Sequence, residues 1–556
     1  MSNAIEDRAT VLQRLHRANG IRDAVAGVLV TLAVLLPWNI ATGITIAGTP
    51  GWVTGLLIVA ALTSLAALVL THVGSRGIGA GDRDFTTLNR LRITLNSPLL
   101  AMALAFLIYA VVQAVRAGGS AAVPPGMGPG AWLAVGGALL GAAPVIAAVG
   151  DDRSGSRACR IIGIVSLVLA VAAVAFNLYW RTRFVLPEIG NAETGTQNLV
   201  VTVAAVFYAV VALLPVIITS RWLMSTNREA RLATVLLAGS ALVAGVFTWV
   251  LPIGRDLDAF HGIAQNTSTA GVGFEGYLAW VAGAGVIATV TVLAALDRKA
   301  VDVWRAAARK CLVLIAVWCG GSAVLRIVDL MMASALDLPA PPYYATTLMA
   351  FDLVAAVVAI WLFLNSSGKS APRMVLTVGY GVLFVLAVCR VIVGVALVPR
   401  VQPLNPDAIT DVYGNTLAQQ ITSTFDVALC VLGAALVVIV FVTGSAHTLA
   451  ARRSTAVAKA AAREQESTPT TTITTYSWPP AEPTVSQAPP TIAIPSPRSA
   501  DTTAFMRPAQ EAAPATAKIF RPDPAPGTDR VAKVLAESTQ RFAAGTTYGG
   551  GDTERH

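Results

Sequence analysis

The chain has 556 residues, of which 55% are hydrophobic and 13% are charged. Soluble globular proteins contain about 25% charged residues, so roughly half of the usual charge is missing. This composition excludes an ordinary soluble enzyme, a collagen-like chain, a disulfide scaffold and a wholly disordered protein. It indicates a multi-pass membrane protein, and the lipid bilayer is therefore the first partner that the sequence predicts.

The formal net charge of +9 is the second bulk property that bears on partners. A basic chain invites a nucleic-acid reading, but membrane proteins concentrate Arg and Lys in their cytoplasmic loops. We therefore predict no nucleic-acid partner. Arg outnumbers Lys by 34 to 6, a bias typical of GC-rich bacterial genomes, so we expect a bacterial cytoplasmic membrane.

Apolar runs of about 20 residues are what an α-helix needs to cross a hydrocarbon core of ~30 Å. Twelve such runs are found, and they lie near 23–42, 52–74, 98–116, 130–149, 161–180, 199–220, 232–252, 276–296, 311–333, 346–365, 375–398 and 422–443. They predict an all-α transmembrane domain over 23–443, with about 12 helices arranged as hairpins.

Basic residues decide the orientation of these helices. The N-terminal segment and every second loop hold 21 Arg and Lys residues, whereas the alternate loops hold 5. Because positive charge is retained on the cytoplasmic side, both termini are expected in the cytoplasm.

Residues 1–22 form a basic N-terminal segment ahead of the first run. Val11, Leu12 and Leu15 share one helical face, with Arg14 beside them. This pattern suits a short amphipathic helix on the membrane surface, and a frayed basic leader is an equally open alternative.

The composition changes at about residue 444. Residues 444–556 hold 13 of the 30 prolines, together with Thr- and Ala-rich runs, so this tail is predicted to be disordered. Within it, residues 529–542 place apolar side chains at helical spacing and form a candidate helical island. The island predicts a cytoplasmic protein partner of the tail, and a transient helix without a partner is the alternative.

Charged residues inside the last four runs form a repeated pattern. Arg326 and Arg390 lie in the ninth and eleventh runs, and Phe351-Asp352 and Phe425-Asp426 lie in the tenth and twelfth. The order of an Arg followed by a Phe-Asp therefore occurs twice. It suggests a duplicated helical hairpin, although short similarities between apolar runs also arise by chance.

The depth of these charges makes them candidate site residues. At a rise of 1.5 Å per residue, they fall within one layer in the outer half of the membrane, and Asp329 follows Arg326 at a spacing that allows pairing on one helix. We call this set the charged layer; it comprises Arg326, Asp329, Asp352, Arg390 and Asp426. A lone charge at the bilayer centre costs at least ~2.5–3.5 kcal/mol, so these residues either pair or line water.

Sequence motifs for catalysis or metal binding are lacking. The five cysteines show no metal-ligand spacing, and neither H-E-x-x-H nor G-x-S-x-G occurs. We therefore predict no cofactor and no metal, and an enzyme is the less favoured class. Polyprenyl-phosphate glycosyltransferases were considered because they carry acidic residues in a long first outer loop, but the loop at 43–51 is short and contains no acid.

Two hypotheses of function follow. The first is a permease that moves a small solute or ion through the charged layer, because ionisable residues within membrane helices mark substrate and proton pathways. The alternative is a scaffold or regulator of the cell envelope that acts through its cytoplasmic tail. Fixed Arg–Asp pairs that only lock helices together would also explain the charges.

Overall fold

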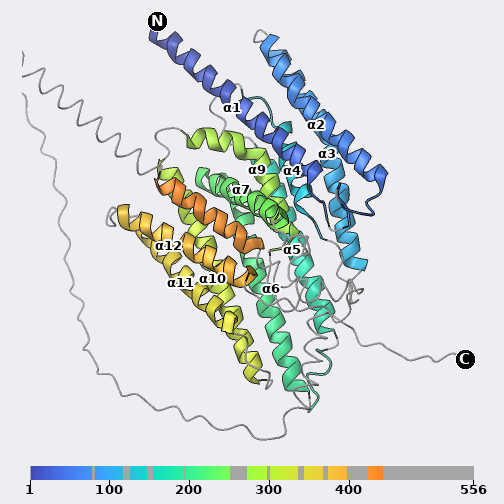
Figure 1. Cartoon of the computed structure of the whole chain (residues 1–556), viewed down its shortest axis with the longest axis vertical. Coiled ribbons are helices and arrows are strands. Elements are labelled where there is room, and N and C mark those ends of the chain that lie inside the picture. The colour runs from blue at the N-terminus through green and yellow to red at the C-terminus, as the bar shows by residue number, and fades with distance from the viewer. Residues whose placement is uncertain are drawn as a thin grey trace, which may run out of the picture. The chain divides into compact units, whose positions relative to one another are not determined.

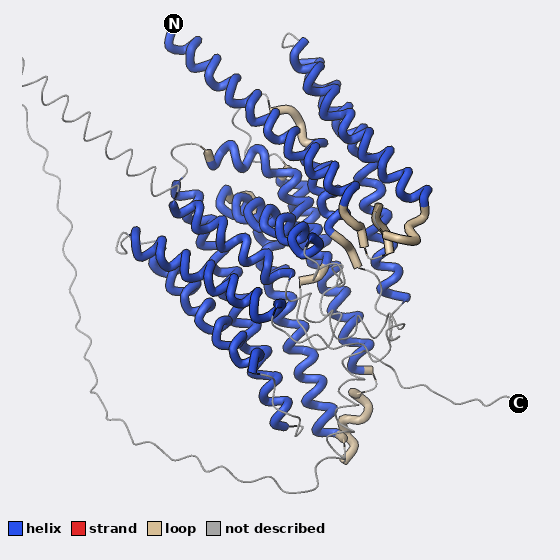
Figure 2. Tube along the Cα trace, viewed as in Figure 1, coloured by secondary structure: helices blue, strands red, loops and turns tan. Residues whose placement is uncertain are grey.

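The protein is described from a computed structural model, and Figures 1 and 2 show that its placed residues are helical, with no β-strand in this part of the chain. The structure describes residues 2–39, 41–44, 46–77, 82–116, 126–146, 155–183, 185–192, 194–250, 272–296, 301–335, 343–366, 373–396 and 424–441. The tail predicted over 444–556, with its candidate island at 529–542, lies outside the described residues.

The helices follow one another with short connections. They are α1 (Ser2–Leu35), α2 (Gly51–Gly77), α3 (Asp82–Arg116), α4 (Pro129–Ala142), α5 (Ser156–Thr182), α6 (Gly195–Met224), α7 (Arg228–Val250), α9 (Phe274–Ala295), α10 (Val301–Ala335), α11 (Tyr343–Asn365) and α12 (Arg373–Val391), which continues into a π-helix at Ile392–Ala396. The last described helix, Thr424–Phe441, is called the final helix below.

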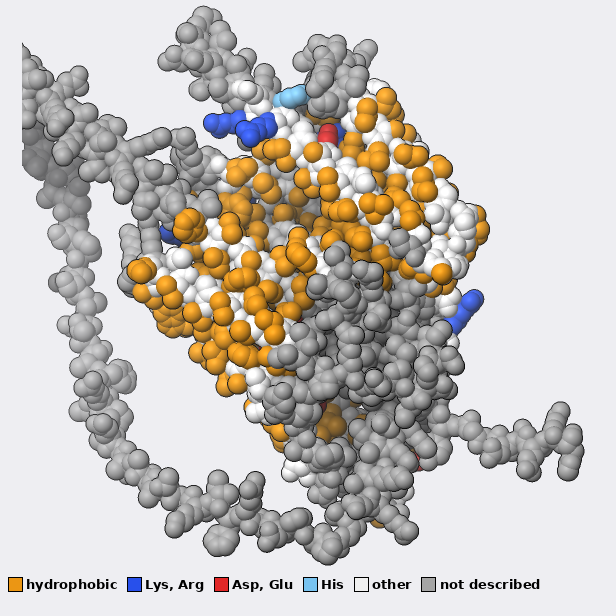
Figure 3. All heavy atoms as spheres, viewed as in Figure 1, with side chains coloured by type: hydrophobic (Ala, Val, Ile, Leu, Met, Phe, Trp, Pro, Cys, Tyr) orange, Lys and Arg blue, Asp and Glu red, His pale blue; other side chains and the backbone are white. Residues whose placement is uncertain are grey.

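Eleven of the described helices are long and apolar enough to cross a membrane. Large apolar side chains such as Trp52, Leu62 and Val168 are more than half exposed, and in Figure 3 hydrophobic side chains cover the visible face of the described helices. Exposed apolar surface of this extent is expected where lipid rather than water is the solvent. The predicted all-α, multi-pass membrane fold is confirmed.

The fourth predicted run, 130–149, differs from the prediction. Its helix, α4, has 14 residues and ends at Ala142, and residues 143–146 are not helical. Fourteen residues span about 21 Å, which is less than the ~30 Å core. Pro144 explains the break: it has no N–H to continue the helix, and it favours an extended residue before it, as the φ of −58° and ψ of 139° at Ala143 show.

Glycines allow α4 to sit in the interior of the bundle. The helix packs against α1, α3 and α9, and most of its residues are buried. A Cβ at Gly130 would lie 2.5 Å from the carbonyl oxygen of Leu36, and one at Gly137 would lie 3.0 Å from the backbone nitrogen of Val30. Only glycine permits backbones to approach this closely.

The helix order recurs with a period of about 145 residues. α9 begins 145 residues after α4, at Phe274 against Pro129. α10 begins 145 residues after α5, and α12 begins 145 residues after α7. The membrane part of the chain is therefore a succession of three four-helix repeats: α1 to α4, α5 to α9, and α10 to the final helix.

Packing and sequence both follow this period. In each of the first two repeats, the first helix packs against the second and fourth, and the third helix packs against the same two. The fourth helices begin with the related sequences Gly-Met-Gly-Pro-Gly-Ala-Trp-Leu-Ala at 126–134 and Gly-Val-Gly-Phe-Glu-Gly-Tyr-Leu-Ala at 271–279. The equivalent rings of Trp132 and Tyr277 are in contact, with centroids 5.0 Å apart. The fourth helices of these two repeats therefore pack side by side.

Candidate functional site

Four residues of the charged layer come together, each from a different helix of the third repeat. Arg326 lies on α10, Asp352 on α11, Arg390 on α12 and Asp426 on the final helix. The third repeat folds so that the end of α10 and the start of α11 are neighbours, which brings these charges to one level. The sequence prediction that they share a layer agrees with this placement.

Asp352 is the centre of the group. Its side chain is 0% exposed, and it faces two guanidinium groups: Arg326 Nε lies 3.3 Å from Oδ2, and Arg390 Nε lies 2.8 Å from Oδ1. A buried carboxylate is tolerated only when it is paired, and Asp352 has a cation on each oxygen. It therefore links α10, α11 and α12.

Arg390 links the same group to the final helix. Its Nη2 lies 3.1 Å from Asp426 Oδ1 and donates to Ser322 Oγ at 3.1 Å, and its Nη1 donates to Cys319 Sγ at 3.4 Å. The indole N–H of Trp318 donates to Asp426 Oδ1 at 2.8 Å. The planar guanidinium is thus held on several sides, as its fixed donor geometry allows.

Asp329 has a different partner from the one that its spacing suggested. Tyr208 of α6 donates its hydroxyl to Asp329 Oδ1, and the ion pair of Arg326 within the described residues is with Asp352, not with Asp329. The charged layer therefore reaches from the third repeat into the second.

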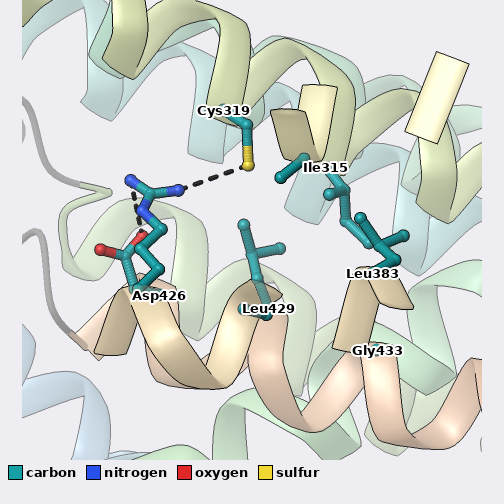
Figure 4. A pocket seen from close by; sticks show the side chains of 9 residues that line it. Ile315, Cys319, Leu383, Asp426, Leu429 and Gly433 are labelled. Atoms are coloured by element: carbon teal, nitrogen blue, oxygen red, sulfur yellow. Dashed lines mark hydrogen bonds and ion pairs between the residues drawn. The ribbon is translucent and has the colours of Figure 1, made fainter. Parts of the chain in front are cut away.

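A small cavity adjoins the paired charges. Its volume is about 20 Å³, enough for about one water molecule. Figure 4 shows Cys319 and Asp426 at one end of it and Ile315 and Leu383 at the other. The space is too small for an organic solute, so the described conformation holds the charged layer closed.

The charges of the layer do not balance. Three carboxylates, from Asp329, Asp352 and Asp426, face two guanidinium groups. An uncompensated charge is expensive in a low-dielectric interior, so one further positive charge would stabilise the group. A proton or a small cation could supply it.

Irregular helix geometry follows Arg390 directly. Ile392–Ala396 form a π-helix, and such segments often occur at functional sites because they place an extra residue in a turn. α12 can therefore change its winding close to the residue that joins Asp352 and Asp426.

A second group of buried charges lies in the first repeat, and sequence reasoning missed it. Arg22 and Arg92 flank Asp23, at 2.9 and 2.5 Å from its Oδ1. Arg22 donates to the carbonyl oxygen of Pro144 at 2.7 Å, and Arg92 donates to that of Gly141 at 2.8 Å. We call these three residues the α4 clamp, because they bind the interrupted end of α4.

Two Asn side chains extend the α4 clamp. Asn19 bonds both the N–H and the carbonyl oxygen of Ile146, and Asn89 accepts from the N–H of Val145. The spacing of Asn89, Arg92 and Asn96 at one helical face ahead of an apolar run is the signal that could have revealed the clamp.

Glu275 is a further buried acid that the sequence prediction left outside the membrane, because the predicted run began at 276. It is 2% exposed and lies in the first turn of α9, where Ser166 Oγ donates to its carbonyl oxygen at 3.0 Å. Phe274-Glu275 and Phe425-Asp426 both stand at the start of a fourth helix. The four-helix period therefore pairs Glu275 with Asp426.

Aromatic rings fill the space between these fourth helices. Phe425 packs edge-on against Trp318 with centroids 4.8 Å apart, and it also contacts Trp280 at 5.8 Å and Tyr277 at 6.3 Å. The rings continue to Trp132 of α4. Asp426 thus lies at the edge of an aromatic cluster that joins all three repeats.

A comparison with protein families gives a match to a domain of unknown function, DUF7937, over residues 19–445. The chain belongs to this family. The matched region contains both the α4 clamp and the charged layer. Searches of curated proteins and of solved structures each find no match to the chain.

Proposed function

We propose that this chain is a transporter-like membrane protein whose charged layer binds a proton or a small cation while a solute or ion crosses. The observation that carries the proposal is the excess of one carboxylate in a closed layer built from five helices. Charges inside membrane segments are costly and mark solute or proton pathways.

The arrangement of the layer supports alternation between two states. Arg390 contacts both Asp352 and Asp426, so protonation of either carboxylate releases one of its partners. Interfaces of this kind are bistable rather than continuously deformable. The π-helix after Arg390 gives α12 a place to rewind when the partner changes.

The side of the membrane follows from the basic loops. The cytoplasmic placement of the termini, inferred from the 21 to 5 distribution of Arg and Lys, puts the charged layer in the outer half of a bacterial cytoplasmic membrane. The closed conformation is then an occluded state that opens outward first.

A proteoliposome assay tests this function. The full chain is reconstituted into vesicles that contain a pH-sensitive dye, and classes of small solute are added in turn at a fixed membrane potential. We expect at least one solute class to acidify the lumen as it enters. Asp352→Asn and Asp426→Asn should abolish that acidification, because each removes an ionisable carboxylate while keeping its shape.

Asp302→Asn is the matched control. Asp302 lies on α10 like Arg326, but its side chain is 93% exposed, so its loss should leave acidification intact. Folded Asn variants, monodisperse in detergent, that still couple solute entry to protons would refute the proposal. If no solute class acidifies wild-type vesicles, proton coupling is also refuted.

The scaffold hypothesis rests on residues 444–556, outside the described part of the chain. A deletion of this tail separates the two functions. A transporter keeps solute-driven acidification without the tail, whereas a scaffold loses the cytoplasmic protein partner that binds it.

A further inference from the structure

A second, larger cavity opens at one end of the bundle, away from the charged layer. It has a volume of about 380 Å³ and lies between α6, α7, α10 and α11, with Trp222, Glu229, Arg309, Lys310 and Phe363 among its lining residues. This volume lies within the range of small-molecule sites. We call it the basic cavity.

The basic cavity lies where helices leave the apolar part of the protein. Trp222 is two residues from the end of α6, Glu229 is the second residue of α7, and Phe363 is two residues from the end of α11. Lys310 directly precedes the apolar run that begins at residue 311. The cavity therefore stands at the level of one membrane surface, on the side that the basic loops identify as cytoplasmic.

Its two cations lack anionic partners within the described residues. The Arg309 guanidinium lies over the Phe363 ring at 4.4 Å, and its Nε is buried without a hydrogen-bond partner there. Among the described ion pairs, neither Arg309 nor Lys310 takes part, whereas Arg305, one turn earlier, lies 3.9 Å from Asp302. Glu229 is the one acid of the lining, so the cations exceed it.

The remaining wall is apolar. Trp222, Val313 and Phe363 line the cavity beside the two cations. A buried N–H donor and a lysine therefore adjoin a surface that suits carbon chains. This combination recognises an amphiphile whose anionic group is attached to an apolar body.

We propose that the basic cavity binds the phosphate of an anionic phospholipid from the cytoplasmic leaflet. The phosphate oxygens accept from Arg309 and Lys310, which replaces the missing partner of Arg309 Nε. The glycerol and the first acyl carbons pack on Trp222 and Val313. Basic pockets between membrane helices on the cytoplasmic side recognise headgroups in this way.

A free phosphate ion shares the same chemistry, and the apolar wall separates the two sources. An inorganic ion gains nothing from Trp222 or Val313, whereas a lipid buries its glycerol and acyl carbons there. The membrane-surface level of the cavity also places lipid headgroups next to it without a diffusion step.

Native mass spectrometry of the full chain tests the proposal. The protein, stripped of lipid in mild detergent, is titrated with phosphatidylglycerol or with phosphatidylcholine of the same acyl chains. We expect the first phosphatidylglycerol to bind about tenfold more tightly than phosphatidylcholine. The double variant Arg309→Gln, Lys310→Gln should lose most of this preference.

Arg305→Gln is the matched control, because it removes the same charge from the same helix outside the cavity; it should keep the preference. Lys310→Gln alone keeps Arg309 on Phe363, and we expect it to weaken phosphatidylglycerol binding about fivefold. Equal binding of the two lipids, or an equal loss in Arg305→Gln, would overturn the proposal. Displacement of phosphatidylglycerol by millimolar inorganic phosphate would overturn the lipid assignment.

Discussion

The α4 clamp and the charged layer are two buried groups made of the same residue types, and they use them differently. In the clamp, two guanidinium groups surround one carboxylate and spend donors on the backbone carbonyls of Gly141 and Pro144. In the charged layer, two guanidinium groups face three carboxylates and bond to side chains. Backbone partners cannot change their charge, whereas carboxylates can.

This difference separates a structural role from a functional one. The clamp satisfies carbonyl groups that the break at Pro144 leaves without helical partners, which lipid cannot do. The charged layer satisfies no broken helix, and its one excess carboxylate gives it a protonation equilibrium. Arg in a membrane helix is therefore informative only together with the groups that it contacts.

The two groups also lie toward opposite membrane surfaces. Both use the first, third and fourth helices of a repeat, but the clamp lies early in α1 and at the end of α4, whereas the layer lies late in α10 and at the start of the final helix. Because a repeat of four helices returns the chain to the same side, α1 and α10 run in the same direction. The first repeat is locked on one side, and the third carries its charges on the other.

Removal of Arg92 should have the largest effect. Arg92→Ala leaves Asp23 without its closest cation and Gly141 without its side-chain donor, and breaking a buried pair costs about 3–5 kcal/mol. We expect little folded protein, measured as the monodisperse fraction after solubilisation. Arg90→Ala is the control, since Arg90 is exposed on the same helix. Equal yields of the two variants would show that the clamp is not structural.

Removal of Arg390 should cost less, about 3 kcal/mol, because the carboxylates that it leaves behind can neutralise themselves by binding protons. Arg390→Met should therefore lower the midpoint of thermal unfolding in detergent, and less so at pH 5 than at pH 8. A midpoint loss that does not depend on pH would contradict the protonation of these carboxylates.

A charge-free version of each group sharpens the comparison. Arg390→Met with Asp352→Asn and Asp426→Asn should regain most of the thermal stability, because apolar or neutral replacement of a buried ion group is often neutral. Arg22→Met and Arg92→Met with Asp23→Asn should not recover, because the carbonyl groups of α4 stay unbonded. Recovery in both groups would remove the distinction between them.

The sequence was sufficient to predict which charges of the third repeat meet. The depths of Arg326, Asp352, Arg390 and Asp426 follow from the rise per residue, and hairpin connections bring equal depths together. It was not sufficient to predict that Tyr208 bonds Asp329, because that contact joins two repeats whose packing no local pattern specifies.

The α4 clamp was missed for a different reason. Counting basic residues assigns Arg22 and Arg92 to cytoplasmic regions, yet both are almost fully buried. Pro144 was taken as a proline tolerated within a membrane helix, whereas it ends α4. The hydropathy of a run shows that it lies in the membrane but not whether its helix is continuous.

The smallest expected effect concerns the contact between the second and third repeats. Tyr208→Phe removes the hydroxyl that Asp329 accepts from and keeps the ring. Loss of a hydrogen bond to a charged group costs about 1.5–3 kcal/mol, and the low end applies because Asp329 is half-buried and can recruit water or a proton. We expect a small decrease in thermal stability that Asp329→Asn in the same chain does not deepen, since one bond is lost only once. Fully additive losses would mean that Asp329 is stabilised by something other than Tyr208, and the charged layer would then end within the third repeat.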